Sequence, residues 1–230
     1  GVNILPVDGP HPAGNVSVQM QRYLPINMGE KVWEVRPEDV ANVGKLFSSG
    51  EYSAQRTVAV AGSSVGQPQY IKTNIGAEIS SLINLTGVDD SYPNRYINGD
   101  VLSGVSVSAQ GYIDFYNNLL TIIPEGNHSR MFGWLPFIDN KIPSLSNTSL
   151  SWLFGKKGYY VDTNMNGEER AFVVTGEMEK VFPMDIYPMQ LLKACMAEDI
   201  EKMEALGIYE VIPEDFGLID YASTSKIDAQ

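Results

Sequence analysis

Apolar residues recur through residues 57–125 in a pattern typical of strands interrupted by one helix. Residues 57–61 and 70–73 are rich in β-branched and aromatic residues, which predicts two strands. Residues 76–85 instead place apolar side chains at helical spacing, and residues 95–107 predict two more strands around glycine turns. This order of strands around one helix suggests a β-grasp module, although periodicity alone does not name it.

The preceding residues, 1–56, resemble part of an α/β domain. A strand is expected at 31–35, followed by a helix that begins at Pro37 and ends near Gly50. Carboxylates at positions 38 and 39 favour this helix start, because they are stabilised by the positive end of the helix dipole. One face of the helix is apolar and is formed by Val40, Val43, Leu46 and Phe47.

Residues 131–182 predict strands and hairpins, with a short helix near 150–154 and an Asn-Gly hairpin turn at 166–167. Residues 183–230 predict helices. Asp185 is expected to cap the first of these helices, whose inward face would be formed by Met189, Leu192, Cys195 and Met196.

A second helix is expected at 200–206, ending at Gly207, and a third turn begins at Pro213. The chain is therefore predicted to be α+β, with four parts: 1–56, 57–130, 131–182 and 183–230.

The charge and cysteine content exclude several classes of protein. The 230 residues carry a formal net charge of −12, which disfavours nucleic acid and anionic lipid as direct partners. The longest apolar runs fall far short of the ~20 residues that a membrane span requires. A single cysteine excludes a disulfide framework. The chain starts at Gly1 without a methionine and stops just after a helix-start motif at 225–228, so we expect it to be a fragment.

Two loops contain partial ligand-binding motifs. Residues 162–167 match the first half of a calcium-binding loop, but Val173 occupies the position of the required glutamate, which favours a hairpin turn. Residues 62–66 are glycine-rich, yet they lack the lysine and the following helix of a phosphate-binding loop. The sequence therefore supports neither calcium nor a nucleotide at these positions.

The remaining reactive side chains also favour structural roles. His11 and His128 are the two histidines and cannot form a zinc site alone, so His11 is expected to stabilise its proline-rich loop. Cys195 is expected to be a small core residue. The acidic group Glu198, Asp199, Glu201 and Glu204 is expected to be a solvated helix face. We assign no catalytic, cofactor-binding or metal-binding residue.

Eleven short sequence blocks, in order across almost the whole chain, resemble the A subunit of the bacterial Na⁺-translocating NADH:quinone reductase. They are GPHPAGN (9–15), GKLF (44–47), VAG (60–62), IGA (75–77), GDVLSG (99–104), PEG (124–126), FGW (132–134), NGEERA (166–171), PMDIYP (183–188), ALG (205–207) and PED (213–215). The resemblance implies that 1–56 is the tail of a Rossmann-like domain and that the soluble-ligand-binding β-grasp domain follows it.

The resemblance also implies a functional role. The A subunit would be a peripheral component on the cytoplasmic face of the bacterial inner membrane, implicated in binding ubiquinone or menaquinone. The residues that would bind quinone stay unassigned. Flavins, the iron–sulfur centre and NADH would belong to other subunits. Related flavin-binding proteins carry cysteine cluster ligands where this chain has Phe182 and Ser223.

Two alternatives remain open. One is a stand-alone β-grasp ligand-binding module, which would lack the helices of 183–230. The other is a hydrolase, which would need a pocket that joins His11 to a serine or aspartate.

A truncated subunit would expose apolar residues that the whole complex covers. The candidates are Trp33, Phe47, Phe132, Trp134 and Phe137. We also expect residues 1–50 to be paired with a second copy or less well ordered than the β-grasp region. Quinone is expected to bind mainly to parts of the full-length protein outside this chain.

The chain purified alone should be colourless, metal-free and inactive with NADH. The reason is that an iron–sulfur cluster needs about four thiolates, and the chain has one. A dinucleotide-binding fingerprint is also missing from the sequence. An absorbance spectrum and an iron determination check this expectation, and flavin absorbance or stoichiometric iron would contradict it.

Overall fold

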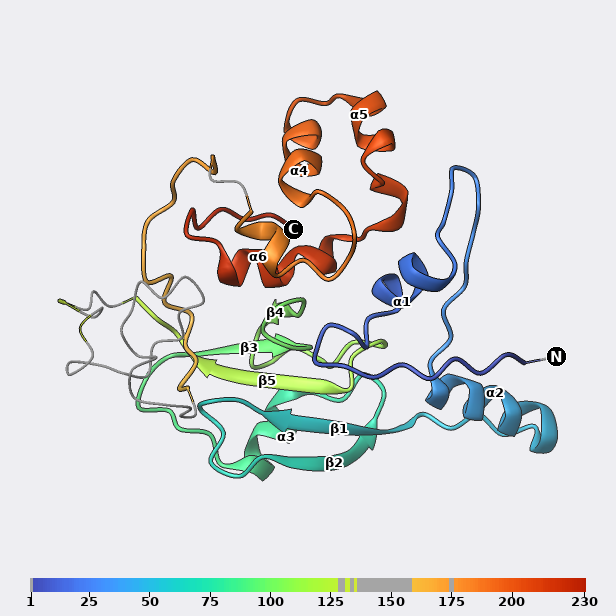
Figure 1. The fold of residues 1–230 in the computed structure, drawn as a ribbon. Coiled ribbons are helices and arrows are strands. Elements are labelled where there is room, and N and C mark those ends of the chain that lie inside the picture. Colours follow the sequence, from blue (N-terminus) through green and yellow to red (C-terminus); the bar gives the residue numbers. More distant parts are fainter. Residues whose placement is uncertain (1, 128–130, 133–134, 136–158, 174–175) are drawn as a thin grey trace. The chain divides into compact units, whose positions relative to one another are not determined.

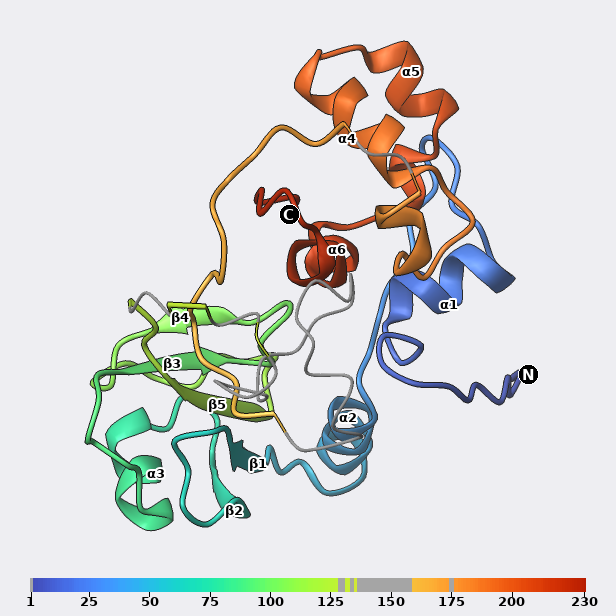
Figure 2. The same cartoon turned by 60° about the vertical axis from the view of Figure 1, so that its left-hand side comes forward.

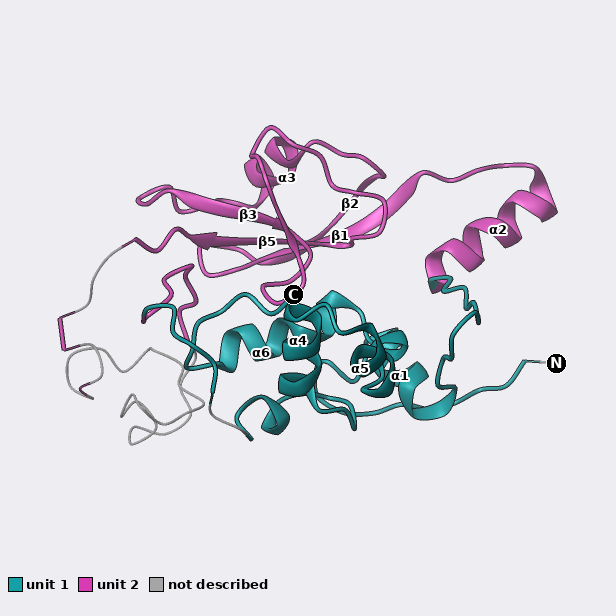
Figure 3. Ribbon diagram, turned by 90° about the horizontal axis from the view of Figure 1, so that it is seen from above, with its two compact units in different colours: residues 1–36, 168–230 teal, residues 37–167 magenta. Residues whose placement is uncertain are grey.

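The computed structural model describes residues 2–127, 131–132, 135, 159–173 and 176–230 (Figure 1). The chain forms two compact units, one from residues 1–36 with 168–230 and the other from residues 37–167 (Figure 3). Together they give a mixed α+β fold. Over the described residues, none of the helices is both long enough and apolar enough to cross a membrane.

The unit of residues 37–167 contains a five-stranded sheet. Its strands are β1 (Gln55–Ala61), β2 (Gln69–Asn74), β3 (Asn94–Asn98), β4 (Val105–Val107) and β5 (Leu119–Pro124). Their order is β2-β1-β5-β3-β4, with β1 and β5 parallel and every other pair antiparallel (Figure 2). The strands expected at 57–61, 70–73 and 95–107 are confirmed, and the apolar run at 119–124 forms the central strand.

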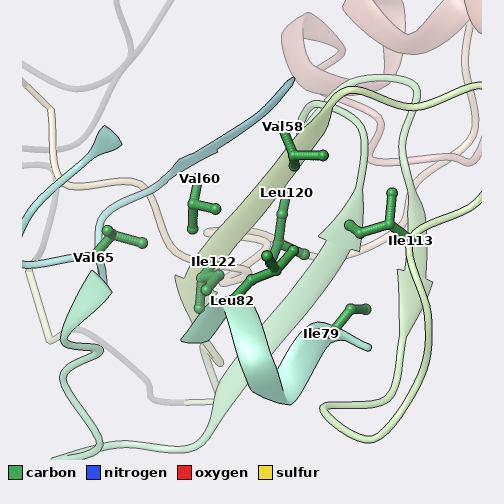
Figure 4. Close-up of a cluster of buried hydrophobic side chains, with 8 residues drawn as sticks. All are labelled: Val58, Val60, Val65, Ile79, Leu82, Ile113, Leu120 and Ile122. Carbon is green, nitrogen blue, oxygen red and sulfur yellow. The ribbon is translucent and has the colours of Figure 1, made fainter. Parts of the chain in front are cut away.

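Helix α3 (Ile79–Thr86) covers one face of this sheet and closes its core (Figure 4). The parallel register pairs Val60 with Leu120, so both side chains point towards α3. Ile79, Leu82 and Leu120 are each at most 1% exposed. Gly87 follows the helix with a left-handed backbone, which glycine adopts without a steric penalty. The alternating apolar residues of the strands and the spaced residues of α3 thus form one core.

Gly62 allows the chain to leave β1 beside β5. Its φ is +130°, and a Cβ built on it would lie 2.0 Å from the carbonyl oxygen of Ile122. That carbonyl also accepts a hydrogen bond from the Ser64 amide at 3.2 Å. A side chain at position 62 would therefore force the two central strands apart.

Gly62→Ala should lower the free energy of unfolding by about 2–5 kcal/mol, because it adds both backbone strain and a steric clash. Gly44→Ala is the matched control. Gly44 lies inside a helix with open space around it, so alanine there should stabilise the chain by about 0.5–1 kcal/mol. Urea unfolding of both variants measures the difference. Equal stability of Gly62→Ala and the unchanged protein would refute the close approach.

Helix α2 (Pro37–Ser49) forms as expected, and Gly50 follows it with a φ of +72°. The strand expected at 31–35 is wrong: these residues have no regular structure, because the described residues offer them no neighbouring strand. A short helix that was not predicted from the sequence, α1 (Val16–Tyr23), precedes them. Trp33 and Phe47 are 89% and 86% exposed, which confirms the exposure expected for them.

The other unit packs short helices around a second core. They are α1, η2 (Met178–Lys180), α4 (Pro188–Met196), α5 (Ile200–Ala205), η3 (Ile208–Glu210), η4 (Pro213–Phe216) and α6 (Gly217–Ala222). The helix expected at 200–206 and the turn at Pro213 are confirmed, and Gly207 has the left-handed backbone of a helix end. The core gathers buried side chains from several of these helices and from the segment between η2 and α4: Met178, Phe182, Met184, Met189, Leu191, Phe216 and Ile219.

Two expectations for the first helix of this region are wrong. Asp185 is exposed and caps nothing; Tyr187 occupies the N-cap position, and α4 starts directly at Pro188. The buried face is Pro188, Met189, Leu191 and Ala194, whereas Cys195 and Met196 are exposed. Pro188 is itself buried, so the buried face begins at the first residue of the helix.

The described parts of 131–182 contain one turn of 3₁₀ helix, η2, and no strand. The hairpin expected at Asn166-Gly167 is wrong. Asn166 does adopt a left-handed φ of +52°, but its side chain donates to the carbonyl of Asn164 at 3.1 Å, so the turn is closed locally. The helix expected near 150–154, Trp134 and Phe137 lie outside the described residues, and Phe132 is 52% exposed. The four domain boundaries, and the β-grasp and Rossmann-like assignments, remain predictions.

Candidate functional site

A groove of about 500 Å³ lies in the unit formed by residues 1–36 and 168–230. It is lined by five apolar residues and two cations: Ala171, Phe172, Met196, Ala197, Ile227, Arg170 and Lys193. Helix α4 supplies Lys193 and Met196, which share a face because they are three residues apart. Residues 170–172, which have no regular secondary structure, form another part of the lining, and the Arg170 amide donates to the Ser225 carbonyl at 2.7 Å.

The groove combines an aromatic ring with positive charge. Lys193 Nζ lies 5.6 Å from the centre of the Phe172 ring, within the range of a cation–π contact. Across the described part of the chain, neither Arg170 nor Lys193 forms an ion pair with a carboxylate. In a chain of net charge −12, two unpaired cations beside apolar side chains give this groove a local preference for electron-rich oxygens. A flat ring with polar oxygens matches such a lining.

This groove was not predicted from the sequence. Its two cations are separated along the chain and belong to no recognisable motif, so only the folded chain brings them together. Met196 was expected to point inward and instead lines the groove with 74% exposure. The expected core role of Cys195 is also wrong, because this thiol is exposed on α4.

Phe182 and Ser223, where the sequence resemblance implies cluster ligands in related flavin-binding proteins, are both buried. Phe182 is 8% exposed, and its ring centre lies 5.0 Å from that of Phe216. Ser223 and Ser225 are buried, and their hydroxyl oxygens are 2.6 Å apart in a mutual hydrogen bond. Aromatic packing and a satisfied hydroxyl pair therefore occupy this region.

The loop at 62–66 uses its backbone amides internally. Ser64, Val65 and Gly66 donate to carbonyl groups of the chain at 2.9–3.2 Å, rather than pointing at an open cradle. The Asp162 carboxylate accepts from the Asn164 amide at 2.9 Å. Within the described residues, no group of three or more histidine, cysteine, aspartate or glutamate side chains could hold a metal ion.

The acidic group at 198–204 has two different roles. Glu198 and Glu201 are exposed, as expected. Asp199 instead caps α5. Its carboxylate accepts a hydrogen bond from the Lys202 backbone amide at 3.2 Å and forms an ion pair with the Lys202 ammonium group at 2.6 Å. Glu204 accepts from the Tyr209 hydroxyl at 2.6 Å. His11 is exposed in its loop and its stabilising role stays a prediction, while His128 lies outside the described residues.

Asp220 is the carboxylate whose pKa is shifted most in this unit. Burial raises the pKa of Asp220 to about 6, although the Ala229 amide, donating at 2.6 Å, acts in the opposite direction. Because the folded chain favours the neutral carboxyl, this group stabilises the fold at low pH. The stabilisation is lost as the pH rises through about 6.

Asp220→Asn should therefore remove part of the pH dependence of stability. The amide keeps an acceptor for Ala229 but carries no charge, so the variant should be more stable than the unchanged protein by about 1–2 kcal/mol at pH 8, with partial solvent exposure taken into account. The two proteins should converge near pH 4. Thermal unfolding between pH 4 and pH 8 tests this, with the exposed Asp185→Asn as control. A constant difference between Asp220→Asn and the unchanged protein at every pH would contradict it.

The structure thus defines two compact units: one contains α2 and the mixed five-stranded sheet, and the other contains the remaining helices outside the sheet unit and a ligand-sized groove. Residues 1–52 match the family model described as the NqrA second alpha/beta domain, and residues 57–109 match the NQRA C-terminal domain. Both matched models are domains of NqrA, so these two segments of the chain are similar to NqrA domains.

Its relatives carry the name of the A subunit of Na(+)-translocating NADH-quinone reductase. The Yersinia pestis bv. Antiqua (strain Angola) protein is 37% identical over 221 residues, which is 96% of this chain and 49% of that protein. The Marinomonas sp. (strain MWYL1) protein is 35% identical over 228 residues, which is 99% of this chain and 51% of that protein. The Neisseria meningitidis serogroup B (strain ATCC BAA-335 / MC58) protein is 33% identical over 221 residues, which is 96% of this chain and 49% of that protein. The chain spans about half the length of these curated relatives.

Proposed function

We propose that this chain is part of the NqrA subunit of a Na⁺-translocating NADH:quinone reductase, the respiratory complex that couples NADH oxidation by quinone to Na⁺ export. The observation that carries the proposal is similarity at 37% identity over 96% of the chain, through both matched domains and the helical residues beyond them. In this role it is a peripheral component at the cytoplasmic face of the bacterial inner membrane. Its partners are the other subunits of the complex.

In this proposal the chain itself binds no flavin, iron–sulfur centre or NADH. The support is chemical: its single thiol, Cys195, is far short of the about four thiolates that a cluster needs. Phe182 and the Ser223–Ser225 pair fill the corresponding region of the core. The electron-transfer groups then belong to partner subunits.

We assign the groove a contributing role in quinone binding. A quinone offers a flat ring that can stack against Phe172 and carbonyl oxygens that can accept from Arg170 or Lys193. Drug-sized ligands are normally enclosed over most of their surface, whereas this groove is open. The groove therefore supplies one wall of the site, and most of the affinity resides in parts of the full-length protein outside these 230 residues.

Two alternatives are less well supported. A stand-alone β-grasp module would lack helices α4, α5 and α6, which are present, and the similarity to the NqrA relatives extends across them. A hydrolase would place His11 in a pocket with a nucleophile. His11 is exposed, and the groove lining does not include it.

A binding measurement with a short-chain ubiquinone analogue tests the proposed function. The protein at the full length of its relatives should bind the analogue at least tenfold more tightly than this chain. Arg170→Gln with Lys193→Gln should weaken binding to the full-length protein about tenfold, or about 1.4 kcal/mol.

Lys202→Gln is the matched control, since Lys202 is paired with Asp199 and lies outside the groove lining. Unchanged affinity in the double variant would remove the groove from the proposal. Equal affinity of the chain and the full-length protein would place the whole site within these residues instead.

A further inference from the structure

The first turn of α2 is fixed to the sheet by a buried cation. Arg56 lies on β1, and its side chain is 2% exposed. It donates from Nη2 to Asp39 Oδ1 at 2.8 Å and from Nη1 to the Phe115 carbonyl at 2.6 Å. The Phe115 ring centre lies 4.9 Å from the guanidinium carbon. A buried, well-partnered guanidinium holds its carboxylate partner in one position, because separating them would leave a charge uncompensated.

A second contact restrains the orientation of the same turn. Asn118, just before β5, donates from Nδ2 to Glu38 Oε2 at 2.8 Å. Two successive residues of α2 are therefore bound to two neighbouring positions of the sheet unit. The helix leaves the sheet in a defined direction rather than as a free linker (Figure 3).

The rest of α2 carries its apolar face outward. Val40, Val43 and Phe47 follow one another at helical spacing and are 57%, 50% and 86% exposed, and Leu46 beside them is 43% exposed. Every residue of α2 is at least partly exposed. An amphipathic helix of this length is normally stabilised by packing its apolar face. The exposed face is thus a surface shaped for a partner.

We infer that this face of α2 docks onto the β-sheet of an α/β domain, a sheet that belongs to the portion of the full-length protein outside this chain. Residues 1–52 match an α/β domain, yet the described residues 2–52 contain two helices and no strand. Helices of such domains pack their apolar faces on a central sheet. The relatives are about twice as long as the region they share with this chain, so they have residues to supply it.

A second copy of the chain fits this face less well. Stable protein–protein interfaces bury roughly 800 Å² per partner, more than four side chains of this size can cover. The inferred docking gives the Arg56–Asp39 ion pair a further consequence. Helix α2 belongs by sequence to the α/β domain but is bound to the sheet of the next unit, so the ion pair links the two domains.

Cysteine reporters in a Cys195→Ser background test the inference, because Cys195 is an exposed thiol. Val43→Cys and Phe47→Cys report on the docking face, and Ala41→Cys reports on the opposite, exposed side of α2. In this chain, a maleimide should label all three at similar rates. In the protein at the full length of its relatives, the two face reporters should react at least tenfold more slowly, with Ala41→Cys unchanged.

Equal labelling of the face reporters in both proteins would overturn the inference. Slow labelling of the face reporters in this chain would also overturn the inference if the labelling slowed further as the protein concentration rose. That result would assign the face to a second copy of the chain. Circular dichroism of each variant establishes that α2 is folded. Should Phe47→Cys destabilise the protein, the smaller change Val43→Cys carries the test.

Discussion

The burial of Arg56 is the constraint on which the arrangement of the larger unit depends. A guanidinium that is almost inaccessible to water must keep its partners, and those partners come from α2, from the loop before β5 and from the Phe115 ring. Its Nε atom has no acceptor among the described residues, so the charge is compensated by the Asp39 carboxylate, by the Phe115 carbonyl and ring, and by the Asn118 side-chain oxygen. Removing Asp39 would therefore disturb β1 and the loop before β5 as well as the helix.

The same contact explains why structure and sequence divide the chain at different places. The two matched family domains meet between residues 52 and 57, which separates α2 from β1. The compact units instead place α2 with the sheet, because its first turn is bound to Arg56 and Asn118. Helix α2 thus matches one family domain by sequence, while its contacts hold it against the sheet of the following domain.

Local sequence patterns predicted the helices and strands that are stabilised by contacts between residues close together in the sequence. Helix α2, helix α3 and the strands β1 and β2 were predicted because alternation, helical spacing and terminal glycines are visible in short windows. The strand at 31–35 failed because strand formation needs a neighbour. The buried face of α4 was misplaced because the core that Met189 and Leu191 join is completed by residues far away in sequence, such as Phe216 and Ile219. For the same reason the groove could not be predicted, since Arg170 and Lys193 meet only after that core has formed.

The helical unit shows how a core can be complete without thiolates. Phe182 packs on Phe216, and the Ser223 and Ser225 hydroxyls satisfy each other, so this region gains its stability from dispersion and hydrogen bonding. A cluster would have tied the geometry of these loops to a metal, whereas packed side chains fix it directly. The chain around Ser225 is held by the Arg170 amide, and the same segment presents Arg170 and Phe172 to the groove. The filled core and the groove are therefore parts of one structure, because the segment bound to Ser225 also forms the wall to which we assign quinone binding.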